Sequence, residues 1–181
     1  MSFSTTLYRI SEDLFRRLES GSIKSNQLVT DAKEIATFQD SPDAIIFLLK
    51  KRTGSEACDV EEIFSPKESR GAVNDEEFQK LVASYQYEEI ERITASTFYF
   101  LPPEKVIAIN SFLTTLDDLE VKMLYDADAL NANNIYPSLW TSDENPGKAY
   151  NLHHIRNDFE ALKRIFEHAS AEKDYILAFS G

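Results

Sequence analysis

Cysteine is almost absent from this chain, since Cys58 is the only one among 181 residues. A single thiol cannot form an internal disulfide, which excludes a small secreted scaffold held together by disulfides. A nucleophilic cysteine needs a nearby cation or a helix N-terminus to stabilise its thiolate. Cys58 instead lies between acidic residues, with Glu56 and Asp59 as its nearest charged neighbours in sequence. We therefore expect no catalytic role for it.

Glycine, proline and long apolar runs are also scarce. Five glycines and six prolines are too few for a low-complexity chain. No apolar run approaches the ~18 residues that a membrane-spanning helix needs, and residues 1–10 lack the apolar core of a signal peptide. These absences predict a cytoplasmic protein that does not enter a membrane. The length fits a single domain, 1–181, at roughly 100–200 residues per domain.

Basic residues are the scarcer charge. The chain has 19 Lys and Arg against 31 Asp and Glu, for a formal net charge of −12. Nucleic-acid binding requires a basic surface that replaces counterions, so no nucleic-acid partner is expected. An anionic membrane surface is disfavoured for the same reason. A basic protein is the partner that this charge permits, because the acidic field would steer it inward. The sequence does not indicate an oligomeric state.

Apolar periodicity predicts a helix-rich α+β fold, in which several amphipathic helices pack around a small mixed sheet. Strands are expected where short apolar and aromatic runs occur, at 7–10, 97–101 and 175–179. Helices are expected where apolar residues recur at three- and four-residue steps, at 12–20, 25–38, 42–53, 75–82, 103–116, 118–124 and 146–170, with a helical turn after Asp126. Ser11 and Ser41 are the expected N-caps of two of these helices.

Residues 53–74 show no sustained periodicity and hold many charges. We interpret them as a long irregular surface loop, with one short turn around 60–64. Loops of this length are uncommon in compact domains unless they are functional or mobile.

The three histidines suggest a metal site, but their spacing opposes one. His153 and His154 are adjacent, so on a helix their side chains diverge by about 100°. His168 lies roughly 21 Å further along the same predicted helix at 1.5 Å per residue, too far for a single ion with ligands near 2 Å. His154 and Asp158 are four residues apart and could share a face, which is as easily a surface hydrogen bond as a ligand pair. We therefore expect no metal and no cofactor.

Residues 126–140 carry the densest group of side chains that recognise ligands. Its binding candidates are Asp126, Asp128, Asn131, Tyr136 and Trp140. Pockets combine aromatic faces with a few placed polar groups, so we predict a concavity beside Tyr136 and Trp140. In the opposing interpretation, Trp140 packs in the core and the Asn side chains act as local caps of helices and turns. The Asp126–Ala–Asp128 pattern fails as a calcium loop, because the glycine and the glutamate that such a loop requires are missing.

A resemblance to a known family rests on several motifs together. These are Leu101-Pro-Pro-Glu-Lys-Val106, Asp126-Ala-Asp-Ala-Leu-Asn131, Ile135-Tyr-Pro137 with Trp140, Phe159-Glu-Ala-Leu-Lys163 and the closing strand. Asp43-Ala-Ile-Ile-Phe-Leu-Leu49 followed by Thr53-Gly54 adds to them. In these motifs the chain resembles the YfbM-like family of uncharacterised bacterial proteins. The resemblance implies a small intracellular α+β domain and supplies no catalytic residues.

Two functions remain open from the sequence. No Walker loop, dinucleotide-binding turn, zinc-protease or serine-hydrolase motif is present, which lowers the expectation of an enzyme. We predict a non-enzymatic intracellular binding protein with an acidic surface, one form of which is a neutralising partner of a basic protein toxin. The alternative is an enzyme or a small-ligand-binding protein that uses residues 126–140.

Overall fold

A computed structural model describes residues 3–24, 27–53, 60–71 and 75–181. Among them, five strands form one sheet in the order β2-β1-β5-β4-β3. Their bounds are β1 Ser4–Ile10, β2 Glu34–Gln39, β3 Glu68–Arg70, β4 Phe98–Leu101 and β5 Tyr175–Ser180. Every neighbouring pair is antiparallel. The α+β class predicted from sequence is confirmed, but the sheet is antiparallel and not mixed.

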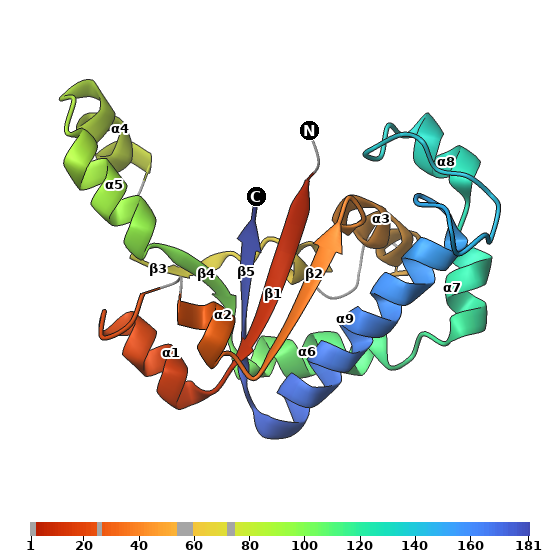
Figure 1. Cartoon of the computed structure of the whole chain (residues 1–181), viewed down its shortest axis with the longest axis horizontal. Helices are drawn as coiled ribbons and strands as arrows, with labels where there is room; N and C mark the ends of the chain where they lie inside the picture. The colour runs from red at the N-terminus through yellow and green to blue at the C-terminus, as the bar shows by residue number, and fades with distance from the viewer. Residues whose placement is uncertain (1–2, 25–26, 54–59, 72–74) are drawn as a thin grey trace.

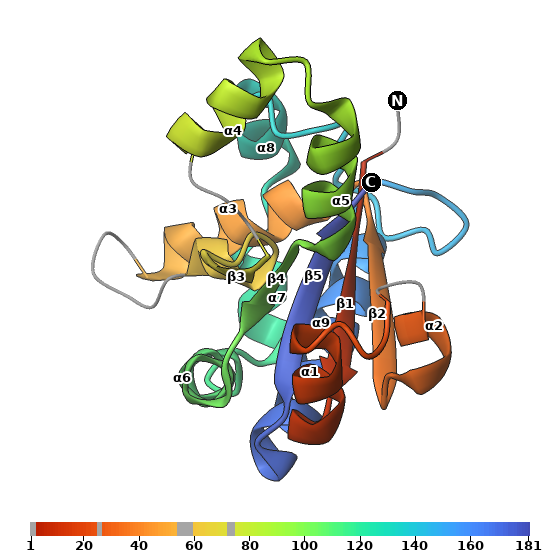
Figure 2. The same cartoon turned by 90° about the vertical axis from the view of Figure 1, so that its left-hand side faces the viewer.

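Helices cover both faces of the sheet (Figures 1 and 2). The helices are α1 Glu12–Glu19, α2 Leu28–Asp31, α3 Pro42–Thr53, α4 Asp75–Ala83, α5 Tyr87–Ser96, α6 Pro103–Leu113, α7 Asp118–Leu124, α8 Ala127–Ala132 and α9 Leu152–Glu172. Figure 2 shows α6 on one side of the strands and α2 on the other. None of the helices in the described part of the chain is long and apolar enough to span a bilayer.

The alternation of side chains along the strands creates two separate cores. Leu7, Ile176 and Ala178 face a large core that α3, α6, α7 and α9 complete. Phe100 and Leu177 face a smaller core that α1 and α2 cover. Since both faces of β5 are buried and both of its edges are paired, β5 is a central strand, as its apolar sequence predicted.

The caps explain several helix starts. The Ser11 hydroxyl accepts a hydrogen bond from Leu14 N–H, which confirms the predicted start of α1. Asp117 caps α7 in the same way. Asn151 caps α9 by accepting from His154 N–H, so α9 begins at Leu152 and not at 146. The hydrogen bond of the Ser41 side chain among the described residues is a different one, since its hydroxyl donates to Asp158 on α9.

Residues 25–38, predicted as one helix, form a short helix and a strand. The helix α2 covers only Leu28–Asp31, and β2 then pairs with β1 from Glu34 onward. Ala36 and Phe38 are buried while Ile35 and Thr37 are exposed. An alternation of apolar and polar side chains, typical of a strand, therefore fits this sequence as well as a helical repeat does. Pairing with β1 selects the strand.

The prediction of a surface loop over 53–74 needs a similar correction. The expected turn is present as a 3-10 helix at Val60–Ile63, but β3 was not expected. Glu62, Ile63 and Phe64 are buried. The Glu62 carboxylate is compensated there by Lys105 Nζ at 2.7 Å and Lys67 Nζ at 3.2 Å, because a buried charge needs partners. Cys58 lies outside the described residues.

Candidate functional site

Helices α4 and α5, residues 75–96, form a helical hairpin that extends from the β3–β4 side of the sheet (Figure 1). The two helices pack on each other. None of the side chains described between residues 76 and 96 is buried. Each helix is nevertheless amphipathic, with Phe78 and Leu81 on α4 and Ile90 and Ile93 on α5 half-exposed. An apolar stripe of this kind normally packs against a core, whereas the apolar face of the hairpin is only partly covered.

The base of the hairpin is held by a close backbone approach. Gly71, just after β3, has φ +77°, and a Cβ there would lie 2.6 Å from the carbonyl oxygen of Ser96. Only glycine fits such an approach at a positive φ. The two ends of the hairpin therefore meet tightly at the sheet, while its far end, the turn with exposed Tyr85 and Tyr87, is free of the core.

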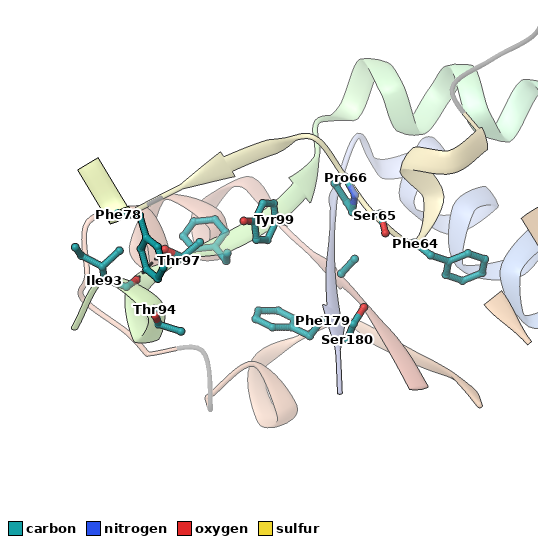
Figure 3. A pocket seen from close by; sticks show the side chains of 12 residues that line it. Phe64, Ser65, Pro66, Phe78, Ile93, Thr94, Thr97, Tyr99, Phe179 and Ser180 are labelled. Carbon is teal, nitrogen blue, oxygen red and sulfur yellow. Dashed lines mark hydrogen bonds between the residues drawn. The ribbon is translucent and has the colours of Figure 1, made fainter. Parts of the chain in front are cut away.

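A cleft of about 680 Å³ separates the hairpin from the end of the sheet. We call it the hairpin cleft. Figure 3 shows Phe78 and Ile93 on the hairpin side, Tyr99 from β4, Phe179 from β5, and Pro66 on the remaining wall. The polar groups in it are hydroxyls, mainly of serine and threonine. Its size and its mostly apolar lining are those of a binding site for a small molecule or for a few residues of a partner.

The hairpin that borders this cleft is acidic. Residues 75–96 hold six acidic and two basic residues. Both bases are already paired, Lys80 with Glu76 at 2.8 Å and Arg92 with Glu89 at 2.5 Å. The Arg92 hydrogen bonds also lower the pKa of Glu89. The hairpin thus keeps a negative charge at any pH near neutrality.

The predicted 126–140 segment is held mainly by contacts within the fold. Asp126 caps α8 by accepting from Ala129 N–H at 2.9 Å, and this bond, aided by Lys51, lowers the pKa of Asp126. Asp128 is exposed in the first turn of α8. Asn131 is bonded twice to Trp140, donating to its carbonyl at 2.8 Å and accepting from its N–H at 2.9 Å.

Trp140 itself belongs to the large core, with 3% of its surface exposed. Its Nε1–H donates to Ile135 O at 3.1 Å, and its ring stacks on His154 and meets the Tyr150 ring edge-on. Tyr136 is 37% exposed. Neither the hairpin cleft nor a smaller cavity of about 280 Å³ between α7 and α9 is lined by the five predicted residues. These contacts match the structural interpretation, and ligand binding by this segment stays a prediction.

Beside Trp140, the structure assembles a polar cluster that the sequence indicated only through the spacing of His154 and Asp158. His154 Nε2 lies 3.3 Å from Asp158 Oδ2, and His154 Nδ1 accepts from Tyr150 N–H at 3.2 Å. The Tyr150 hydroxyl donates to buried Asp40 at 3.0 Å, and this bond raises the pKa of Tyr150. Each group named here has its hydrogen-bond partner inside the fold. The cluster thereby links Asp40, just before α3, to α9.

The remaining histidines have separate partners. His153 lies 3.0 Å from Asn157, and His168 lies 2.8 Å from Glu34. Within the residues that the structure describes, no three His, Cys, Asp or Glu side chains gather as a possible metal site. The expected separation of His168 from the other two along one helix is confirmed.

Sequence reasoning missed the hairpin cleft. The helix over 75–82 was predicted and is present as α4, but α5 was not, although Tyr87, Ile90 and Ile93 recur at three-residue steps. That spacing could have revealed a second amphipathic helix. No sequence signal indicates that the pair lacks a partner, because this depends on where the hairpin leaves the sheet.

Comparisons with known proteins agree with this fold. A family model described as a domain of unknown function, DUF1877, matches residues 1–179. The crystal structure of YfbM from Escherichia coli, a protein of unknown function, is similar with a TM-score of 0.59 and 14% identity. The match covers 97% of this chain and 98% of that one. No curated protein gives a significant match. At this identity the structural likeness concerns the fold alone.

Proposed function

The chain belongs to the DUF1877 family, a domain of unknown function, and we propose that it is a non-enzymatic binding protein that docks a basic protein at the hairpin cleft. The observation that carries this proposal is the α4–α5 hairpin, which presents an apolar face with no buried side chain among those described. Exposed apolar surfaces rimmed by polar residues are typical of interaction sites.

The packing of the hairpin supports a partner. Phe78, Leu81, Ile90 and Ile93 are only partly covered, and Val82, Tyr85 and Tyr87 are exposed. Burial of apolar surface contributes about 25 cal/mol per Å², so a partner that covers this face stabilises the hairpin as it binds. Aromatic side chains are also the residues most enriched at the centres of protein interfaces.

The charge of the hairpin indicates the kind of partner. Glu88 and Glu91 are exposed on α5 and have no ion pair among the described residues. They add to a field that is −12 over the whole chain. Such a field accelerates the approach of a basic protein and repels acidic ones. One specific form of this proposal is neutralisation of a basic protein toxin, in which the acidic hairpin covers a positively charged cleft.

An enzyme or small-ligand protein that uses residues 126–140 is the alternative. Trp140 and Asn131 satisfy each other's hydrogen bonds, and Asp126 serves as a helix cap. These side chains are engaged in the fold before any ligand arrives. The alternative therefore has less support than docking at the hairpin cleft.

Capture from a lysate of the source organism tests the proposal with four forms of the chain. The hairpin variant carries Glu88→Gln and Glu91→Gln, and a matched control carries Glu160→Gln and Glu167→Gln on α9, both exposed. A third variant, Phe78→Ser, alters the cleft. Capture is run at low and at high salt, because exposed charges are screened beyond about 8 Å at physiological ionic strength.

The proposal predicts a basic protein that the wild type and the α9 control retain at low salt. The hairpin variant and Phe78→Ser should retain less of it, and high salt should release it. Association of the purified pair should slow by roughly three- to tenfold in the hairpin variant, with a smaller change in the control. Partners that are insensitive to salt and to all three variants would contradict the proposal.

A further inference from the structure

The edge of β5 that faces the hairpin cleft has backbone groups with no partner among the described residues. Ser4 and Gly181 exchange both of their backbone hydrogen bonds, at 2.9 and 3.0 Å. In an antiparallel ladder successive residues point their N–H and C=O groups to opposite sides. The N–H and C=O of Ser180 therefore point away from β1, toward the β4 side.

The strand that would meet them turns away. β4 pairs with β5 only as far as Tyr99 opposite Ala178, and the same register would place Phe98 opposite Phe179 and Thr97 opposite Ser180. Thr97 instead ends α5, and its N–H donates to Ile93 O at 2.9 Å. The ladder stops two residues before the end of β5. The hairpin cleft opens at that point, with Thr97 and Ser180 both in its wall (Figure 3).

Side chains around this gap suit an extended chain. Phe179 and Tyr99 lie on either side of it and Phe78 lies opposite (Figure 3). Tyr99 is 46% exposed. A helix satisfies its own backbone and could not use the Ser180 groups, whereas an extended segment can pair with a free strand edge and place alternate side chains into pockets.

Two acidic residues of α5, Glu89 and Glu91, lie at different angles from its apolar face that borders the gap. At about 100° per residue, Glu89 lies about 70° to one side of the midline between Ile90 and Ile93, and Glu91 lies about 130° to the other side. Glu89 is paired with Arg92, and Glu91 is exposed with no ion pair in the described part of the chain. A segment that lies along this face therefore meets apolar groups with the paired Glu89 carboxylate beside them, and the unpaired charge of Glu91 lies further round the helix.

From these observations we propose that the basic partner inserts an extended segment into the hairpin cleft, where it pairs with Ser180 as an added strand. The segment carries an aromatic or aliphatic side chain toward Tyr99, on the face of the sheet that Ala178 and Ser180 share, and a Lys or Arg further along that reaches Glu91. This inference rests on the proposed function and specifies its binding mode. Two backbone hydrogen bonds provide orientation, and the apolar contacts provide most of the affinity.

A matched pair of variants isolates the backbone contact. Ser180→Pro removes the N–H that points into the cleft, and leaves the hydrogen bonds between β1 and β5 intact because the Ser180 N–H takes no part in them. Ser180→Ala removes the same hydroxyl, which lies 3.2 Å from the Thr5 hydroxyl, but keeps the N–H. The probe is a random dodecapeptide library displayed on phage and selected against the full chain, followed by synthesis of the enriched peptides.

The inference predicts enriched peptides with apolar residues at alternate positions and flanking Lys or Arg. In amide NMR spectra they should shift the signals of Ser180, Phe179 and Tyr99. Ser180→Pro should weaken binding about three- to tenfold relative to Ser180→Ala, the equivalent of one hydrogen bond. N-methylation of the peptide at one of two adjacent positions should have a similar effect, which provides a second test if Ser180→Pro folds poorly.

Other occupants give different results. Peptides that bind equally well after N-methylation at every position, or that leave the Ser180 signal unchanged, would overturn strand pairing. Concentration-dependent shifts at Ser180 in the free chain would assign the cleft to a second copy and also overturn it. If strand pairing fails while Glu88→Gln with Glu91→Gln still weakens the basic partner, the proposed function stands without this mode. If both variants leave binding unchanged, both proposals fail.

Discussion

Replacement of Trp140 by Phe distinguishes a structural role for residues 126–140 from a binding role. The ring is 3% exposed and its Nε1–H donates to Ile135 O at 3.1 Å. Phe removes this donor and leaves the Ile135 carbonyl without its partner, which costs about 1 kcal/mol of folding free energy. Phe also leaves a void where the five-membered ring was, which costs about 1–2 kcal/mol. We therefore expect a loss of about 2–3 kcal/mol in the free energy of unfolding.

Urea titration measures this loss directly, and thermal melting should show a fall in Tm of roughly 4–12 °C for a chain of this size. Leu139→Ala is the matched control, because Leu139 precedes Trp140 and is 65% exposed. Its effect should stay within about 0.5 kcal/mol. Asn131→Ala should also destabilise, since it removes both bonds to the Trp140 backbone. A Trp140→Phe protein as stable as the wild type would refute this account and return the ring to a binding role.

Three further predictions concern charge burial and the backbone. Glu62→Gln should cost about 1–3 kcal/mol, whereas Glu61→Gln, at an exposed pair, should cost under about 0.5 kcal/mol in the same urea titration. Hydrogen bonds from Lys148 and Asn151 are the main reason why the pKa of Asp143 is lowered from 3.8 to about 2. The ionised Asp143 therefore stabilises the folded chain fully above pH 3.8, and this stabilisation is lost as the pH falls toward 2. The difference in free energy of unfolding between wild type and Asp143→Asn should accordingly shrink between about pH 6 and pH 3. Gly71→Ala should destabilise more than Gly21→Ala by at least about 1 kcal/mol, since both have positive φ but only Gly71 is crowded; equal melting temperatures would contradict the close approach at the hairpin base.

Local signals predicted much of the fold. Ser11 caps α1 where expected, and the apolar run at 175–179 forms the central strand. The prediction was wrong over 25–38, where a helical period and a strand period both fit the apolar residues. It was also wrong around Glu62, where a buried acidic residue made a core segment look like a surface loop. Pairing with β1 and the ion pair of Glu62 with Lys105 decide these cases, and both involve parts of the chain outside the local segment.

The candidate site was harder to predict than the fold. The 126–140 segment is rich in recognition side chains, yet Asn131 and Trp140 recognise each other. Composition cannot distinguish side chains that await a ligand from side chains that bind their own backbone. Conversely, the hairpin cleft consists of common residues such as Phe78 and Ile93. Its significance depends on the missing cover over the hairpin and on the early end of the β4–β5 ladder.

Hydrogen–deuterium exchange of the chain, free and bound to the captured basic partner, tests the central claim most directly. Docking at the hairpin cleft predicts slower exchange in peptides covering α4, α5 and the end of β5, because binding covers the hairpin and pairs the Ser180 N–H. Peptides covering residues 126–151 should exchange at unchanged rates. Protection confined to 126–151, with the hairpin exchanging as fast as in the free chain, would contradict the account.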